Sequence, residues 1–153
     1  MGFDMYLNAT KYLSKFSNPD KAEEVRKLFL EMFKIDNIDS IEIKFEAGYW
    51  RKANHIHKWF VDNVQYEEDD CREYSFSREE LLKLKEICLK AVESFNNKEI
   101  EKLKEDLPVQ SGFFFGGTEY NEDYLNDCKE TIKIIDRCLT LPDDWGFEYN
   151  SSW

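Results

Sequence analysis

The sequence lacks the features that would place the chain in a membrane or a secretory pathway. It has no run of the roughly 18 to 20 apolar residues that a membrane-spanning helix requires. Its first residues lack the basic start and apolar stretch of a signal peptide. Tyr6 stands where a myristoylation signal has Ser or Thr. We therefore expect a cytoplasmic protein with no membrane partner.

Motifs for cofactors, metals and nucleophilic catalysis are also missing. The glycines form neither a P-loop nor a GxGxxG fingerprint, and Ser111 lacks a GxSxG elbow. His55 and His57 diverge by about 200° on a helix, which disfavours one shared metal. The cysteines show no CxxC or CxxH spacing, and the last three lie in apolar helical patterns typical of core thiols. They are Cys71, Cys88, Cys128 and Cys138. We predict no metal and no cofactor.

Basic residues are scarce. Twenty-one Lys and Arg face 32 Asp and Glu, which gives a formal net charge of −11. Such a surface repels the phosphate backbone, so duplex nucleic acid is a poor partner. A small anion in one locally positive pocket remains compatible, because the electric field is local. With 42% hydrophobic residues and no linker or repeat, the chain is expected to form one domain over 1–153.

Hydrophobic periodicity predicts short strands mixed with helices. Period-two alternation indicates strands near 2–13, 39–50, 72–76 and 143–153, and apolar stripes indicate helices. The first helix begins after Asn18 with Pro19 at its first position, and Ser77 with Glu80 forms a capping box for another. The remaining helices are expected at about 50–64, 97–107 and 125–139. Half-polar strands are typical of antiparallel sheets, so we predict an α+β fold with a small, mostly antiparallel sheet against four to five helices.

The first unusual segment, residues 47–60, contains no acidic residue. Its strand-to-helix junction is expected to present unpaired helix N–H groups, which favour an anion, with Trp50 as a stacking surface. Helical spacing puts His57 beside the apolar stripe and His55 on the outward side. The predicted ligand-binding residues of this segment are Tyr49, Trp50, Arg51, Lys52, Asn54 and His57. The alternative is an amphipathic helix that merely lacks acids on its wet face.

The second unusual segment, Leu107 to Thr118, contains no charged residue. Its glycines would let the backbone approach a ligand closely. Gln110 and Ser111 would supply polar contacts and Phe114 a stacking surface. The alternative is a buried central strand that ends in a glycine turn.

Four consecutive acids, residues 67–70, form the third unusual segment. A solvated turn is one interpretation, because neighbouring carboxylates rarely converge on one metal. The other interpretation is that one carboxylate, Asp70, assists the acid-free segment 47–60. If the protein is an enzyme, His57 with Asp70 would be the general base pair. The competing interpretation of His57 is a core histidine with satisfied hydrogen bonds.

Five motifs in order resemble a family of small uncharacterised proteins of bacteriophages and prophages. They are MG-DMYL, YWRKAN-IHKWFV, DDC, QSGFFFG and a terminal SSW. Phe3 and His55 stand where the family pattern would have Leu and Ala. The resemblance implies an accessory protein in the host cell cytoplasm that acts on host machinery, often against host defence.

The sequence and the resemblance together favour a non-enzymatic phage protein that sequesters a small anionic ligand such as a nucleotide immune messenger. One alternative is an acidic inhibitor that binds a host protein. Another is a hydrolase that cleaves the nucleotide. A homo-oligomer is a further expectation, with the tail aromatics Trp145, Phe147 and Tyr149 at an interface.

Overall fold

The computed structural model describes residues 2–153 and contains a four-stranded sheet with the order β2-β1-β4-β3. All neighbouring strands pair antiparallel. The strands are β1 (Asp4–Ser14), β2 (Ser40–Arg51), β3 (Tyr74–Phe76) and β4 (Gly146–Ser152). The α+β prediction is confirmed, and the C-terminal segment is a central strand.

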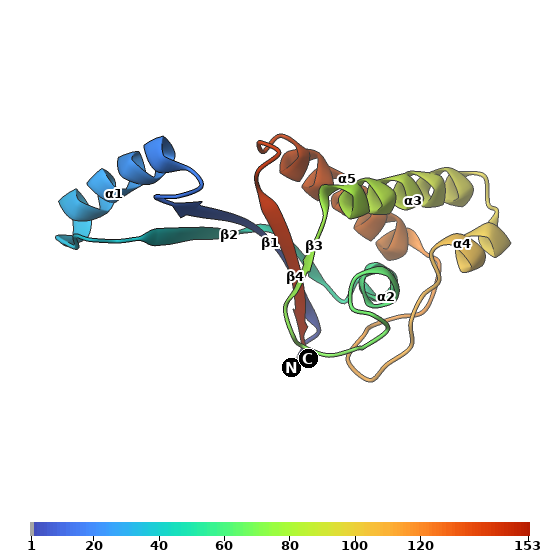
Figure 1. Cartoon of the computed structure of the whole chain (residues 1–153). Helices are drawn as coiled ribbons and strands as arrows, with labels where there is room; N and C mark the ends of the chain where they lie inside the picture. The colour runs from blue at the N-terminus through green and yellow to red at the C-terminus, as the bar shows by residue number, and fades with distance from the viewer. Residues whose placement is uncertain (1) are drawn as a thin grey trace.

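Five helices accompany the sheet, and α2 to α5 lie on one side of it (Figure 1). They are α1 (Pro19–Phe33), α2 (Asn54–Asn63), α3 (Arg78–Asn96), α4 (Ile100–Asp106) and α5 (Glu122–Leu139). The predicted capping box of α3 is present, with both reciprocal bonds between Ser77 and Glu80. Within residues 2–153 no helix combines the length and the apolar character needed to span a membrane.

One face of the sheet forms the core and the other faces solvent. In β1 every second residue is buried, including Met5, Leu7 and Ala9. In β4 the buried residues include Phe147 and Tyr149, and the Tyr149 ring stacks on Phe60 of α2 with centroids 3.8 Å apart. Phe147 and Tyr149 therefore belong to the core of their own chain and are not available for an oligomer interface, whereas Trp145 is only partly buried. Cys88, Cys128 and Cys138 are buried free thiols, as predicted.

A β-bulge in β2 reverses which side chains face the core. Leu7 pairs with Gly48 and Asn8 pairs with Glu46, so Ala47 is the extra residue. Before the bulge, Ile41 is on the buried face, and after it the buried residues are Gly48 and Trp50. Because side chains alternate with period two, one extra residue moves the following side chains to the opposite face.

The same strand continues further than predicted, which corrects the start of the next helix. β2 runs through Arg51, and α2 begins at Asn54 rather than near Trp50. Trp50 therefore lies in the sheet, where its indole Nε1–H donates to the Thr131 hydroxyl of α5 at 2.9 Å. Pairing with β1 satisfies the β2 backbone, so tertiary hydrogen bonds prevail over local helical periodicity here.

The β1–β2 connection forms an arm that projects from the rest of the molecule. We call residues 12–39 the α1 arm; they comprise the end of β1, all of α1 and the approach to β2. In Figure 1 the chain connects α1 to the body through the ends of these two strands, and Lys21 of α1 also pairs with Asp144 of the body at 3.6 Å. The helix begins at Pro19 as predicted, although the Asn18 side chain makes no capping bond.

We predict that Gly48→Ala lowers the free energy of unfolding by about 1–3 kcal/mol, because a methyl group at the bulge would overpack the interface with α5. A Cβ on Gly48 would overlap the Ile134 side chain, with its Cδ1 at 3.2 Å. Gly117→Ala is the matched control, since nothing lies within 4 Å of its added Cβ. Urea titration of both variants measures the difference, and equal stabilities would contradict the packing described for Gly48.

Candidate functional site

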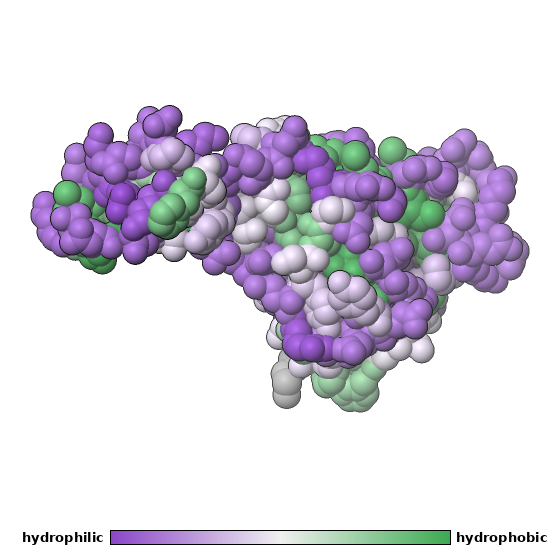
Figure 2. All heavy atoms as spheres, in the orientation of Figure 1, coloured by the Kyte–Doolittle hydropathy of each residue, from purple (hydrophilic) through white to green (hydrophobic). Residues whose placement is uncertain are grey.

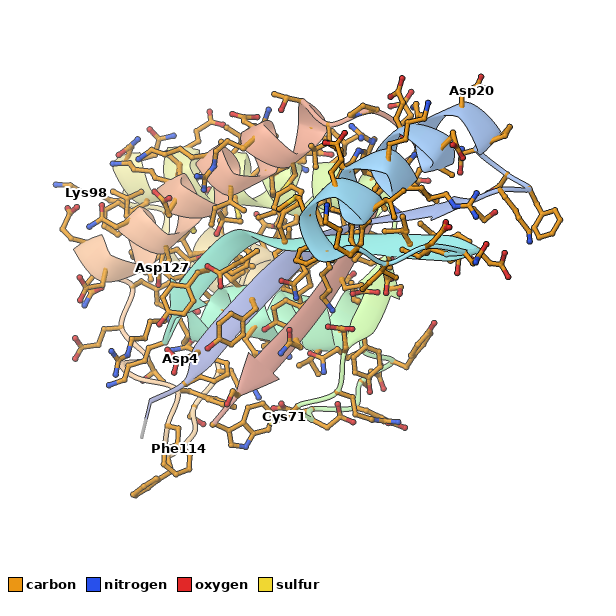
Figure 3. The ribbon with its side chains drawn as sticks, turned by 90° about the vertical axis from the view of Figure 1, so that its left-hand side faces the viewer. Asp4, Asp20, Cys71, Lys98, Phe114 and Asp127 are labelled. Carbon is orange, nitrogen blue, oxygen red and sulfur yellow. The ribbon has the colours of Figure 1, made fainter. Side chains whose placement is uncertain are left out.

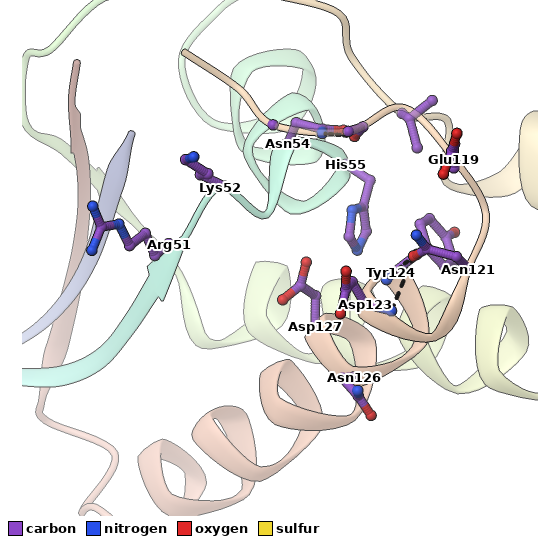
Figure 4. A pocket seen from close by; sticks show the side chains of 13 residues that line it. Arg51, Lys52, Asn54, His55, Glu119, Asn121, Asp123, Tyr124, Asn126 and Asp127 are labelled. Atoms are coloured by element: carbon purple, nitrogen blue, oxygen red, sulfur yellow. Dashed lines mark hydrogen bonds between the residues drawn. The ribbon is translucent and has the colours of Figure 1, made fainter. Parts of the chain in front are cut away.

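The first unusual segment (residues 47–60, the acid-free segment) and the second (residues 107–118, the charge-free segment) meet at one cavity of about 340 Å³. The cavity lies between the end of β2, α5 and the loop before α5 (Figure 4). Arg51, Lys52, Asn54 and His55 come from the first segment, and Gly116 and Gly117 from the second. The opposite wall is formed by α5 and the residues before it. Its polar members are Glu119, Asn121, Asp123, Asn126 and Asp127, with Tyr124 among them. Two regions that stood out separately in the sequence are thus one place in the fold.

Backbone conformation brings these two segments into contact. Lys52 lies in the left-handed region with φ of 62°. Ala53 follows with φ of −76° and ψ of 69°, an inverse γ-turn in which the Asn54 N–H donates to the Lys52 carbonyl. Gly116 has φ of 85°, and a Cβ there would lie 3.1 Å from Lys52 Cβ. Glycine is therefore required at 116 both for its φ and for close approach to Lys52.

The buried side chain of Asn54 holds the loop that closes this cavity. Its Nδ2 donates to the carbonyls of Phe115 at 3.0 Å and Gly117 at 2.7 Å, while its Oδ1 accepts from the Gln110 backbone N–H at 3.0 Å. One amide thus satisfies three backbone groups of the loop 108–121, and both of its amide hydrogens and its carbonyl oxygen are used. Asn54 was predicted to bind ligand; in the structure it organises the loop.

His57 connects the same helix to β4 and to the acidic segment. Its Nδ1 lies 2.8 Å from the Tyr149 hydroxyl and its Nε2 lies 2.9 Å from Asp69 Oδ1. Burial lowers the pKa of His57, and Asp69 opposes part of that shift. A neutral ring fits both bonds, with Nε2–H donating to Asp69 and Nδ1 accepting from Tyr149. The ring is fully buried, so the interpretation as a satisfied core histidine is the one that the contacts favour.

The carboxylate beside His57 is Asp69, which corrects the predicted pairing with Asp70. Asp69 Oδ2 also accepts from the Gln110 side chain at 3.0 Å, so Asp69 joins α2 to the charge-free loop. Asp70 instead contacts Arg72 and accepts a bond from the Tyr74 hydroxyl at 3.1 Å, and Arg72 lowers its pKa. From the sequence, Asp69 and Asp70 were equivalent candidates for the partner of His57. Only the path of the backbone through the turn distinguishes them.

Other predicted residues lie away from the cavity. The buried Trp50 cannot offer a ring face to a ligand, and the Tyr49 hydroxyl donates to Asp4 at 2.5 Å on the solvent side of the sheet. Ser111 is exposed, and Phe114 lies near the tip of its loop (Figure 3). That loop is not the buried central strand offered as the alternative.

Charge is divided across the cavity. Arg51 and Lys52 lie at the β2 end, where Arg51 Nε is 3.9 Å from Asp4, and Figure 4 shows both side chains extending away from the acids. Asp123 and Asp127 lie on α5 opposite them. Burial, together with repulsion from Asp123, raises the pKa of Asp127 to about 7. The predicted positive pocket is therefore a cavity with one cationic side and one acidic side.

The floor of the cavity contains a neutral histidine. His55 was expected to point outward, but it is buried against Tyr124, with ring centroids 4.1 Å apart. Its Nε2 lies 3.7 Å from the Cys128 thiol, and burial lowers its pKa to about 3. His55 therefore remains uncharged at neutral pH. Within residues 2–153 no group of three His, Cys, Asp or Glu side chains is arranged to hold a metal ion.

Sequence reasoning missed the acidic side of the cavity, although one signal was present. Asp127 lies three residues after Tyr124 and four before Thr131, and both of these are buried on α5. Helical spacing places all three on neighbouring positions of one face. A carboxylate beside an apolar stripe is costly to bury, which makes Asp127 a candidate site residue.

We predict that Asp127→Asn stabilises the protein at high pH. A folded-state pKa of about 7 lies above the ordinary value of 3.8, so the free energy of unfolding falls as pH rises between these values. The asparagine side chain cannot ionise, so the variant does not lose this stability as pH rises. Thermal or urea unfolding should show the variant more stable by about 1–3 kcal/mol at about pH 8.5, with the gap narrowing toward pH 4.

Glu130→Gln provides the matched control, because Glu130 is an exposed acid of α5 that forms only a surface pair with Lys133. Its stability should follow the wild-type pH profile within about 0.5 kcal/mol. Parallel pH profiles for wild type and Asp127→Asn would contradict the perturbed pKa.

No family model matches the chain, and the comparisons with curated proteins and with solved structures also found no match. The resemblance to phage proteins thus stays an expectation carried by its five motifs.

Proposed function

We propose that this protein binds a small anionic ligand of nucleotide size in the cavity between β2 and α5 and sequesters it without cleavage. The observation that carries this proposal is the convergence of the acid-free and charge-free segments on one hollow. Its volume of about 340 Å³ falls within the range of small-molecule sites, which are typically about 300–1,000 Å³.

The divided charge suits a ligand with two chemically different ends. A nucleotide carries phosphate oxygens that accept hydrogen bonds and a base whose N–H groups donate them. Arg51 and Lys52 would hold the phosphate, Arg51 through its planar fork and Lys52 as a point charge. Asp127 and Asp123 would accept from the base, since charge-assisted bonds to carboxylates are among the stronger ones.

Arg51 and Lys52 are able to move into this role. The Arg51 side chain is 63% exposed, and its nearest carboxylate is the 3.9 Å contact with Asp4. Lys52 is exposed, and no ion pair of Lys52 is found within residues 2–153. Both side chains can therefore turn toward the cavity without breaking a buried interaction. The left-handed backbone of Lys52 also supports a site here, because strained positions gather where function requires them.

Binding without chemistry is favoured by the state of His57. A general base has to reach the proton that it removes, but the His57 ring is fully buried and both of its nitrogens are occupied. His57 and Asp69 act here as positioning residues that hold the loop. The phage resemblance adds the context, namely a nucleotide signal of host defence in the host cytoplasm, and sequestration would keep that signal from its receptor.

We predict that isothermal titration with mono-, di- and cyclic nucleotides reveals a binder, and that Arg51→Ala with Lys52→Ala weakens it at least about tenfold, because charged hydrogen bonds to phosphate are lost. Lys58→Ala is the matched control, since Lys58 is a nearby cation of α2 that pairs with Asp62 and does not line the cavity. Ligand released by heating should be chemically intact.

Three results would count against this proposal. If no nucleotide binds, the acidic surface and a host protein partner become the better explanation. If binding is unchanged in the double variant, the ligand lies elsewhere. If the recovered ligand is altered, the protein is a hydrolase and sequestration is wrong.

A further inference from the structure

The α1 arm exposes an unusual share of the apolar surface. Fourteen large hydrophobic side chains are exposed within residues 2–153, and seven of them lie between residues 12 and 35. They are Tyr12, Phe16, Leu28, Leu30, Met32, Phe33 and Ile35. Figure 2 shows apolar side chains at the surface of this projecting part of the molecule. Half of the exposed large hydrophobics thus occupy 24 residues, which marks an interaction surface rather than scattered exposure.

The helix of the arm has an apolar stripe that its own chain covers only in part. Val25, Leu28, Phe29, Met32 and Phe33 follow the i, i+3, i+4, i+7, i+8 spacing of a helix that packs against a partner. Only Ala22 of this helix is buried. Leu28 is 55% exposed, Met32 70% and Phe33 56%.

A helix with an exposed apolar stripe needs further packing to be stable. Isolated helices of about 12 to 15 residues are marginal in water, and most helical stability in proteins comes from packing an amphipathic face. α1 has 15 residues, and its contacts with the body are mainly those with β1 and an ion pair between Lys21 and Asp144 at 3.6 Å. A second helix laid on the stripe would supply the missing contacts.

The distribution of charge along α1 indicates which helix would pack on its apolar stripe. In the half 19–25, Asp20, Glu23 and Glu24 outweigh Lys21 and leave a net charge of −2. In the half 26–34, Arg26, Lys27 and Lys34 outweigh Glu31 and leave +2. This order also complements the helix dipole. An antiparallel copy places each −2 half opposite a +2 half, so the helix is complementary to itself.

The segment 19–34 is neutral as a whole, although the chain carries −11. Two copies can therefore meet through their arms while the acidic bodies stay apart, since α1 projects away from the body (Figure 1). A two-fold axis brings the same patch of both subunits together, which is the commonest form of oligomer.

We infer that α1 is a dimerisation element and that its partner is α1 of a second copy of this chain, packed antiparallel so that Leu28 lies near the two-fold axis and Met32 and Phe33 of each copy lie against the N-terminal half of the other helix. The apolar stripe supplies the affinity, and the charge segregation fixes the antiparallel orientation. The ligand cavity lies on the body and does not take part in this contact.

Sedimentation velocity of the full chain over a range of micromolar concentrations tests the inference. The wild type should approach twice the 18.4 kDa mass of one chain as concentration rises. Leu28→Lys with Met32→Lys should abolish the dimer and leave a folded monomer by circular dichroism. Leu82→Lys with Leu89→Lys on α3 is the matched control, because these leucines are 48% and 49% exposed outside the arm. A monomeric wild type, or a dimer that survives the arm substitutions, would overturn the inference.

A charge-exchange experiment distinguishes self-pairing from adhesion through apolar surface alone. Lys27→Glu with Lys34→Glu makes both halves of α1 negative, and Glu23→Lys with Glu24→Lys makes both halves positive. Each double variant should dimerise more weakly than wild type at low salt, whereas an equimolar mixture of the two should form a heterodimer. A mixture that associates no better than either variant alone would refute the antiparallel arrangement.

Discussion

The folded arrangement of this protein depends on one continuous chain of hydrogen bonds. It runs from the Tyr149 hydroxyl through His57 and Asp69 to the Gln110 side chain. The Gln110 backbone continues it to Asn54, which holds the carbonyls of Phe115 and Gly117. The central strand, α2, the acidic turn and the loop 108–121 are thus joined by side chains that are far apart in sequence. Because buried polar groups are costly when unpaired, each member depends on the presence of the next.

This network explains the composition of the unusual sequence segments in structural terms. Histidine, asparagine and glutamine are neutral groups that can donate and accept in a buried setting. The acid-free segment buries Asn54, His55 and His57 together, and a carboxylate at those positions would pay a desolvation cost without a partner. The single acid that the network needs, Asp69, comes from outside that segment and keeps one edge toward solvent. The absence of acids at these three buried positions therefore has a structural cause that holds whatever the cavity binds.

The cavity beside the network carries a cost that its own chain does not offset. Asp127 is partly buried near Asp123, and its raised pKa reflects the unfavourable free energy of ionising it there. A residue whose placement is energetically unfavourable, such as a partly buried carboxylate with no cationic partner, tends to mark a functional site. A ligand that donates hydrogen bonds to this carboxylate would recover that free energy on binding, which links the geometry of the cavity to the proposed role.

Much of the fold could be predicted from local patterns. The alternation in β1 and β4, the Ser77 capping box and the buried cysteines all depend on short-range rules, and the structure agrees with them. The bulge at Ala47 could not be predicted, and it moved Trp50 from the expected site into the core. The choice of Asp69 over Asp70 depends on how a turn is routed after α2, which local spacing does not encode.

The candidate site was predicted only in part. Both unusual segments were predicted to supply ligand-binding residues, and Arg51 and Lys52 do line the cavity. The acids opposite them come from α5, whose position is set by packing over long sequence distances, including the Trp50–Thr131 bond. A site formed by two segments that are about 70 residues apart requires the tertiary fold before its charge balance is known.

Asn54 fixes the loop 108–121 and thereby shapes the cavity. Amide hydrogen exchange followed by NMR in Asn54→Ala tests it most directly, with Asn63→Ala as control because Asn63 is an exposed residue of the same helix that bonds only to Trp59. We expect the amides of Gln110 and Phe115 to exchange much faster in Asn54→Ala, while those of α3 and α5 keep their protection. Unchanged exchange in the loop, or an equal loss of protection in Asn63→Ala, would contradict it.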